Sequence, residues 1–220
     1  MTKVRIWDLP TRLFHWSLAV LVFAAIITVK VGGNAMVWHF YCGYTILALL
    51  IFRLIWGIIG ARYARFSSFS LRPASLLAYL REPKAGHSQR FAGHTPIGSL
   101  SVLAILLVLL AQACSGLFAN DDIDSEGPLV KFISKDVSDQ FSWFHAELNS
   151  VIIYGLIALH IAAIAYYFFR KKENLVKPML TGDKENLDIS LAAKDTWRSS
   201  LLALILFALS FASVVWLTKR

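Results

Sequence analysis

The sequence predicts an all-α integral membrane protein, a helical bundle that crosses the bilayer five times. Of its 220 residues, 57% are hydrophobic and only 16% are charged, whereas ordinary soluble domains carry about 25% charged residues. The mean hydropathy is +0.58. Five apolar runs of 19 to 29 residues are each long enough to span a membrane. Because lipid offers the backbone no hydrogen-bond partners, these runs are expected to be helices.

The five runs differ in length and in their connections. The turn between the first two holds Gly32 and Gly33 and is short, so these helices should be antiparallel neighbours. The segment 73–81 (PASLLAYLR) predicts either an amphipathic helix on the membrane surface or an ordinary connecting helix. We expect the first apolar run to be a retained helix and not a cleavable signal peptide. The expected spans are residues 13–31, 36–60, 97–119, 141–169 and 199–218.

The positive charges favour one orientation. The net charge is +8, but the basic residues flank apolar runs, which favours membrane topology over nucleic-acid binding. Sixteen Lys and Arg residues lie in 1–12, 61–96 and 170–198, against five at the other ends of the runs. We therefore expect the N-terminus in the cytoplasm and the C-terminus in the periplasm. The loop 120–140, with six acids, would face outward.

Histidines are the first candidate functional residues. Of the six, His15, His39, His145 and His160 lie in apolar runs, whereas His87 is expected in a loop. An ionisable residue inside a span is costly and indicates function, although a single one is as readily a hydrogen-bonded packing residue.

The depths of these four histidines sort them into two pairs. The alternating directions of the helices put His39 and His145 at the outer level. His15 then shares the inner level with His160, which follows His145 by roughly 22 Å along its helix. About 60° separates the two fourth-span rings around the helix axis, so both can face one seam. Two imidazoles at one depth on facing helices are what an axially ligated haem needs.

Other residues are candidates for holding the cofactor or its substrate. Gly43, one turn from His39, would let a flat macrocycle approach the backbone. Arg12 and Arg53, near the inner level, could pair with haem propionates or could extend to lipid headgroups. His94 could support a propionate or a quinone head group, or could be only a polar residue at a helix entry.

Several motifs then resemble those of the bacterial di-haem b-type cytochromes of the cytochrome b(561) and nickel–iron-hydrogenase group. The matching segments are WDLPTRLFHW at 7–16, RLIWGIIG at 53–60, ARF at 64–66 with Phe69, and GHTPIG at 93–98. The resemblance covers residues 3 to about 172 and includes both fourth-span histidines. It implies two b-type haems, with His39 and His145 on the outer haem and His15 and His160 on the inner haem.

The resemblance also implies a function and a division of the chain. Residues 1–172 would form the di-haem four-helix membrane domain, and 173–220 a cytoplasmic linker and fifth transmembrane helix. The subunit would sit in the bacterial inner membrane and pass electrons between the quinone pool and a periplasmic partner. That partner would be a hydrogenase, another oxidoreductase or a c-type cytochrome. A homodimer is left open, as is a bridge between Cys42 and Cys114.

Two alternatives stand beside this hypothesis. Some smaller members of the family oxidise superoxide without a partner, but the outer loop here has six acids against Lys131 and Lys135, which would repel that anion. The second alternative is a transporter or proton channel without haem, in which the intramembrane histidines and Glu147 form a relay.

Overall fold

The computed structural model of the chain describes residues 3–81, 91–123, 125–185, 188, 190, 192–193 and 195–219. Some residues used in the sequence analysis lie outside these ranges. They are His87, Lys84, Arg90, Asp124, Lys194 and Arg220.

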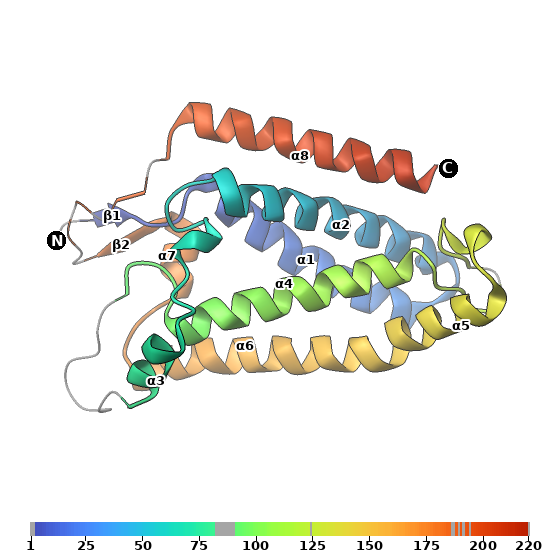
Figure 1. Ribbon diagram of the computed structural model, residues 1–220, viewed down its shortest axis with the longest axis horizontal. Coiled ribbons are helices and arrows are strands. Elements are labelled where there is room, and N and C mark those ends of the chain that lie inside the picture. The colour runs from blue at the N-terminus through green and yellow to red at the C-terminus, as the bar shows by residue number, and fades with distance from the viewer. Residues whose placement is uncertain are drawn as a thin grey trace.

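The described residues form a helical bundle in which five helical segments are long and apolar enough to cross a membrane (Figure 1). The fourth is composite: two α-helices joined by a π-helical turn make one segment of 36 residues, Lys135–Arg170. The segments are α1 (Leu9–Val31), α2 (Met36–Ile59), α4 (Pro96–Gly116), α5 (Lys135–Trp143) with the π turn η4 (Phe144–Asn149) and α6 (Ser150–Arg170), and α8 (Trp197–Thr218).

Helix starts explain where these bounds differ from the apolar runs. α1 begins four residues before the predicted 13, with Asp8 as its N-cap and a proline in its first turn, a position that proline favours. α5 begins at Lys135 because the Ser134 side chain accepts from the Val137 N–H, so the fourth segment starts well before the predicted 141. A polar residue at the N-cap favours the start of a helix. Each of these helices therefore begins at its polar cap and not at the first apolar residue.

Short elements connect the spans. The helix predicted at 73–81 is present as α3 (Pro73–Arg81). Two three-residue strands, β1 and β2, pair antiparallel although about 180 residues separate them, and the sequence analysis did not predict them. Arg5 fastens this pair by donating to Asp183 and Asp195 over 2.7 and 2.6 Å. The remaining elements are β1 (Lys3–Arg5), η1 (Gly33–Ala35), η2 (Phe66–Ser68), η3 (Val130–Phe132), α7 (Val176–Thr181) and β2 (Asp183–Glu185).

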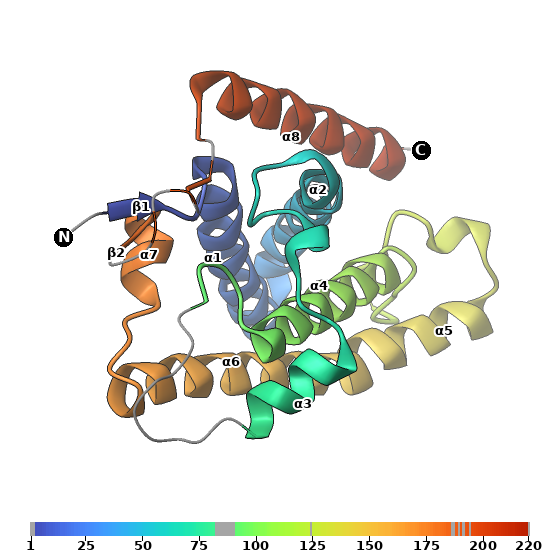
Figure 2. The same ribbon diagram turned by 60° about the vertical axis from the view of Figure 1, so that its left-hand side comes forward.

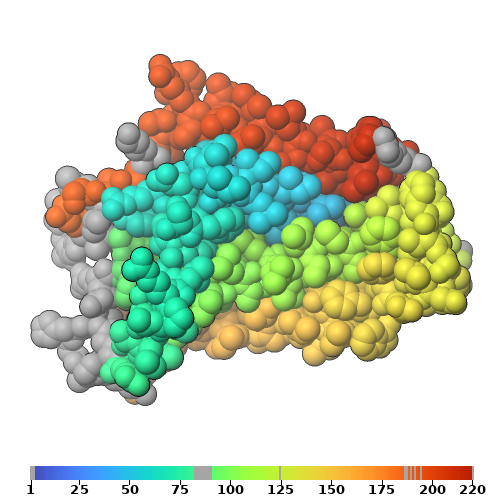
Figure 3. Space-filling model, viewed as in Figure 1, coloured from blue at the N-terminus to red at the C-terminus, as the bar shows by residue number. Residues whose placement is uncertain are grey.

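α2 is the central helix of the bundle. It packs against α1, α4 and α8, and α4 packs in turn against α6 (Figure 2). α8 lies along α2 on the outside of the bundle (Figure 3). We call the end that carries residues 3–8, 61–81 and 171–185 the basic end, and the end that carries 32–35 and 117–134 the acidic end.

Burial is uneven among the spans. We compare the most apolar stretch of 18 residues in each span. In the α2 span 56% of these residues are buried, whereas in the fourth span only 6% are buried. Within α6, Ile153 is the one residue buried by other described residues. Few residues of the fourth span are therefore covered by neighbouring helices, although a helix normally buries one face.

Candidate functional site

The first pair of histidines lies toward the acidic end, where His39 of α2 faces His145 of the π turn. Their ring centres are 6.1 Å apart and their planes are nearly perpendicular, at 88°. His39 Nδ1 is 3.0 Å from the carbonyl oxygen of Ala25, and His145 Nδ1 is 2.9 Å from that of Gln112. A backbone carbonyl only accepts, so each Nδ1 carries the proton and each Nε2 keeps a free lone pair.

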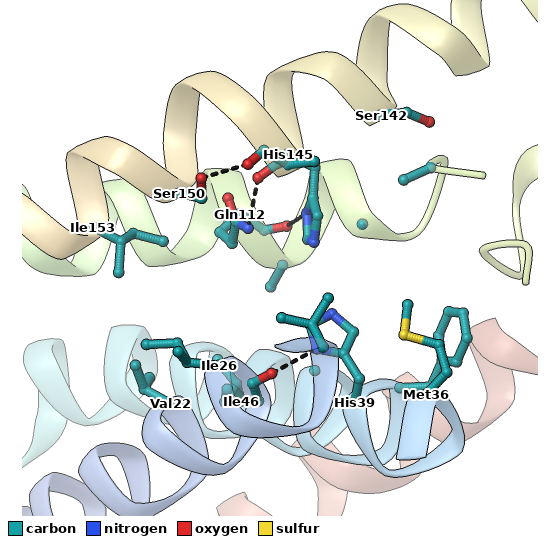
Figure 4. Close-up of a pocket in the computed structure, with 18 of the residues that line it drawn as sticks. Val22, Ile26, Met36, His39, Ile46, Gln112, Ser142, His145, Ser150 and Ile153 are labelled. Carbon is teal, nitrogen blue, oxygen red and sulfur yellow. Dashed lines mark hydrogen bonds between the residues drawn. The ribbon is translucent and has the colours of Figure 1, made fainter. Parts of the chain in front are cut away.

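A cavity of about 560 Å³ separates these two rings. Helices α1, α2, α4 and the fourth span all contribute to its wall, and Figure 4 shows His39 and His145 on opposite sides of it. Gly43 also lines the cavity, and a Cβ added there would meet nothing in the described structure within 4 Å. The space beside Gly43 thus belongs to a mostly apolar cavity of a size usual for cofactor sites.

Two features of this pair were missed by the sequence analysis. His145 lies in a π turn, an element that often marks functional sites. The His145 ring also rests against Gly116, where an added Cβ would come 2.7 Å from Cε1 of the ring. The glycine was visible in the sequence, but its neighbour depends on the register between α4 and the π turn.

The second pair lies toward the basic end, where His15 of α1 faces His160 of α6. Their ring centres are 6.3 Å apart, with an angle of 51° between the planes. Unlike the first pair, His15 has a buried Nδ1 with no hydrogen-bond partner among the described residues.

Orphaned polar atoms lie at the same end of the bundle as this second pair. Within the described residues, six buried side-chain nitrogen or oxygen atoms have no hydrogen-bond partner, and all six lie toward the basic end. They are Asp8 Oδ1, Thr11 Oγ1, Arg12 Nε, His15 Nδ1, Arg53 Nη1 and Ser99 Oγ. Leaving such a group unpaired costs about 1–3 kcal/mol. Since most of these atoms can donate, the cluster fits a ligand that presents acceptor oxygens.

Arg53 is the most buried cation of this cluster. It is only 3% exposed, and its guanidinium lies over the ring of Phe66, 4.8 Å from the centroid. Arg12 is placed differently, because its Nη1 already donates to the carbonyl oxygen of Leu180 at 2.7 Å. Both predicted arginines therefore lie toward the end that holds the second pair, and each has a buried nitrogen without a hydrogen-bond partner among the described residues.

His94 and Asp8 complete the basic end. The His94 ring packs against Trp7 and Phe69, with centroid separations of 4.7 and 5.1 Å. Burial lowers the pKa of His94 to about 4, helped by the nearby charges of Arg53 and His15, so this ring is neutral at pH 7.

Asp8 is buried and accepts a hydrogen bond from Trp56 Nε1 at 2.9 Å. Burial raises the pKa of its carboxyl, although the hydrogen bond from Trp56 and the nearby Thr11 side chain act in the opposite direction. Asp8 is also close enough to Arg53 for their charges to interact.

The histidine pairs suit a metal held mainly by a macrocycle. No group of three or more His, Cys, Asp or Glu side chains that could hold a bare metal ion occurs among the described residues. Two metal–nitrogen bonds of about 2.0 Å on opposite sides of one ion put the ring centres roughly 6.3 Å apart. The observed 6.1 and 6.3 Å fit a porphyrin iron between each pair. Cys42 and Cys114 are both free thiols.

Comparison with known proteins identifies the family of the chain. No curated protein and no solved structure matches the chain. A family described as "Prokaryotic cytochrome b561" matches residues 6–182, which include α1, α2, α4, the fourth span and all four paired histidines. Members of this family are membrane b-type cytochromes that carry haem and transfer electrons. This multi-pass membrane protein belongs to the prokaryotic cytochrome b561 family.

Proposed function

We propose that the chain is a di-haem electron-transfer subunit that passes electrons between the membrane quinone pool and a periplasmic redox partner. His39 and His145 would be the axial ligands of one haem, and His15 and His160 those of the other. The observation that carries the proposal is the spacing of the ring centres, 6.1 and 6.3 Å, in two pairs toward opposite ends of one bundle.

Haem iron, when bound, would supply a one-electron carrier, while the chain fixes its ligands and surroundings. The carbonyls of Ala25 and Gln112 hold the Nδ1–H groups of His39 and His145, so their Nε2 atoms are directed toward the cavity. Toward the basic end, Arg53 and Arg12 offer N–H groups to propionate oxygens.

A haem count tests this proposal directly. We expect the purified chain to give two b-type haems in a pyridine haemochrome assay, and a redox titration to resolve two one-electron steps. One haem per chain would contradict the paired arrangement while leaving a b-type cytochrome. A colourless chain that binds no added haemin would instead favour the transporter hypothesis.

We place the quinone site at the basic end, near His94 and Arg53. A neutral imidazole can donate or accept a hydrogen bond, and the neighbouring Trp7 and Phe69 offer flat apolar surface to a quinone ring. His94→Ala is expected to lower quinol turnover and leave both haem spectra intact. Unchanged turnover together with unchanged spectra would remove His94 from the quinone site.

We infer that the acidic end faces the periplasm of a bacterial inner membrane and receives the partner. The inference depends on the excess of basic residues at the other end. A reporter that is active only in the periplasm, fused after Thr218, should be active, and the same reporter fused before Lys3 should be silent. The reverse pattern would exchange the two faces.

The superoxide hypothesis remains a second candidate, and one observation bears on it. The cavity between His39 and His145 is lined by Lys30 but also by Asp121 and Glu147. This mixture does not make the strongly positive funnel that speeds the arrival of an anion. Rapid superoxide consumption by the chain alone, with quinone and without a partner, would reverse our ranking.

A further inference from the structure

Two amide side chains, the buried Asn149 and the half-buried Gln112, form a hydrogen-bonded ladder between α4 and the π turn that carries His145. Asn149 is 2% exposed, and its Nδ2 donates to the carbonyl oxygen of Val108 at 3.0 Å and to Gln112 Oε1 at 2.8 Å. Gln112 Nε2 donates in turn to the carbonyl oxygen of His145 at 3.0 Å. Amides in an apolar bundle are costly unless satisfied, and Asn149 Nδ2, Gln112 Oε1 and Gln112 Nε2 each have a partner.

The ladder holds the π turn at both of its ends. His145 is the second residue of the turn and Asn149 is its last. Their partners Val108 and Gln112 are four residues apart on α4 and therefore lie on the same face of that helix. π-helical turns are rare inside α-helices. The hydrogen bonds from α4 stabilise this one at both ends.

Gln112 contacts His145 in two ways at once. Its side chain donates to the His145 backbone, and its own backbone carbonyl accepts from His145 Nδ1 at 2.9 Å (Figure 4). Gly116, one turn further along α4, bounds the ring on its other side. Any rotation of the π turn about its axis would therefore break the Nδ1–H bond or press the ring onto α4.

We propose that Asn149 and Gln112 are positioning residues that set the orientation of the His145 imidazole. They act through the π turn, and neither is proposed to touch the iron. The inference rests on the proposed function, since it takes His145 as an axial ligand. It predicts that the plane of this ligand, and hence the electronic state of the haem toward the acidic end, responds to changes in two side chains that are not themselves ligands of the iron.

The test uses the full chain loaded with haem. Asn149→Leu and Gln112→Met remove the amides and keep side chains of similar length. The g values of low-spin haem in electron paramagnetic resonance report the angle between axial ligand planes. We expect both variants to shift the highest g value of the His39–His145 haem and to leave that of the His15–His160 haem unchanged. Transfer of haem to an excess apoprotein acceptor should show that site weakened about 10- to 100-fold.

Matched controls separate positioning from general disruption. Ser210→Ala removes another buried polar group, on α8, whose hydroxyl donates to Leu206 within its own helix, and it should change neither signal. If the two residues act as one unit, the double variant should resemble each single variant rather than add their effects. If Asn149→Leu does not accumulate, Gln112→Met alone carries the test.

The outcomes are distinguishable from failure of the proposed function. Unchanged g values and unchanged haem affinity in Gln112→Met would overturn the positioning role, even where His145→Ala loses one haem. A His145→Ala variant that keeps two haems would overturn the ligand assignment itself, and the positioning role would fall with it.

Discussion

The two histidine pairs have nearly the same spacing but very different surroundings. Toward the acidic end, the Nδ1 atoms of His39 and His145 both reach backbone carbonyls, and an open apolar cavity lies between the rings. Toward the basic end, His15 Nδ1 has no partner in the described chain, and five further orphaned polar atoms lie near it. Both Nδ1 atoms of the first pair have hydrogen-bond partners within the protein. At the second pair, the orphaned polar atoms toward the basic end would find partners in a bound ligand.

This difference suggests how each site holds its cofactor. Toward the acidic end, ligand orientation is built into the fold, so shape and hydrogen bonds to the imidazoles should dominate affinity. Toward the basic end, buried cations and hydroxyls favour a ligand with acceptor oxygens, so charge should dominate. The two sites should therefore respond to different classes of mutation.

The largest expected effect is the loss of one haem when one ligand is removed. His145→Ala should reduce the haemochrome count from two haems to one, and His15→Ala should do the same at the other site. The remaining haem should keep its midpoint potential, because the pairs lie toward opposite ends of the bundle. Loss of both haems from either variant, in a protein that still folds, would show that the sites are not independent.

Filling the cradle beside Gly43 should affect only the site toward the acidic end. Gly43→Leu would extend a side chain into space where a Cβ now meets nothing within 4 Å in the described structure. A residue other than glycine also favours the helix by about 0.5–1 kcal/mol. We expect a folded protein with unchanged helicity by circular dichroism and with one haem. Two haems with unaltered potentials would mean that no macrocycle lies against Gly43.

Charge at the basic end should set the potential of the second haem. Oxidised haem carries one more positive charge than reduced haem, so removal of the buried Arg53 cation stabilises the oxidised form. Arg53→Leu should lower that midpoint potential by roughly 40–90 mV, which corresponds to about 1–2 kcal/mol for one electron. Arg53→Lys should retain most of the wild-type value. A change in the other haem's potential instead would reverse the assignment of Arg53.

Much of this arrangement was accessible from the sequence because it depends on apolar length and helix direction. The five spans and the grouping of His15 with His160 follow from those two quantities, and the helix at 73–81 was predicted from the residues of that segment. The early start of α5 could have been predicted from Ser134, a residue type that caps helices.

Other features could not have been predicted, because they depend on contacts between distant segments. The π turn exists where Asn149 and Gln112 meet across two helices, and no local pattern encodes it. The β1–β2 pair consists of two strands of three residues each, too short for an alternating pattern to be recognised. Likewise, only the packed helices show that Thr11 Oγ1 and Ser99 Oγ are buried without a hydrogen-bond partner among the described residues.

The titration of His94 should make the stability of the basic end depend on pH. The pKa of His94 is lowered to about 4 by burial, from 6.5 in an exposed chain. Between these values the unfolded chain binds a proton that the folded chain does not, so stability falls as pH drops below about 6.5. The full effect, reached near pH 4, is about 3 kcal/mol.

Thermal unfolding of wild type and His94→Gln between pH 4.5 and 7.5 measures this contribution. The wild-type melting temperature should fall more steeply with acidity than that of the variant, and the two curves should run parallel above pH 7. Parallel curves over the whole range would mean that His94 is protonated as readily in the folded protein as in the unfolded one.

The smallest expected effect concerns docking at the acidic end. Lys135 already pairs with Asp122 and Asp139 at 2.5 and 2.6 Å, so part of the negative charge there is compensated within the chain. Electron exchange with a basic c-type cytochrome, measured by stopped flow, should slow several-fold between about 10 and 150 mM salt. Lys135→Gln would release both acids and should raise the low-salt rate about twofold, with a steeper salt dependence. Docking charges act through the rate of encounter. If the rate changed neither with salt nor in Lys135→Gln, the partner would not dock at the acidic end.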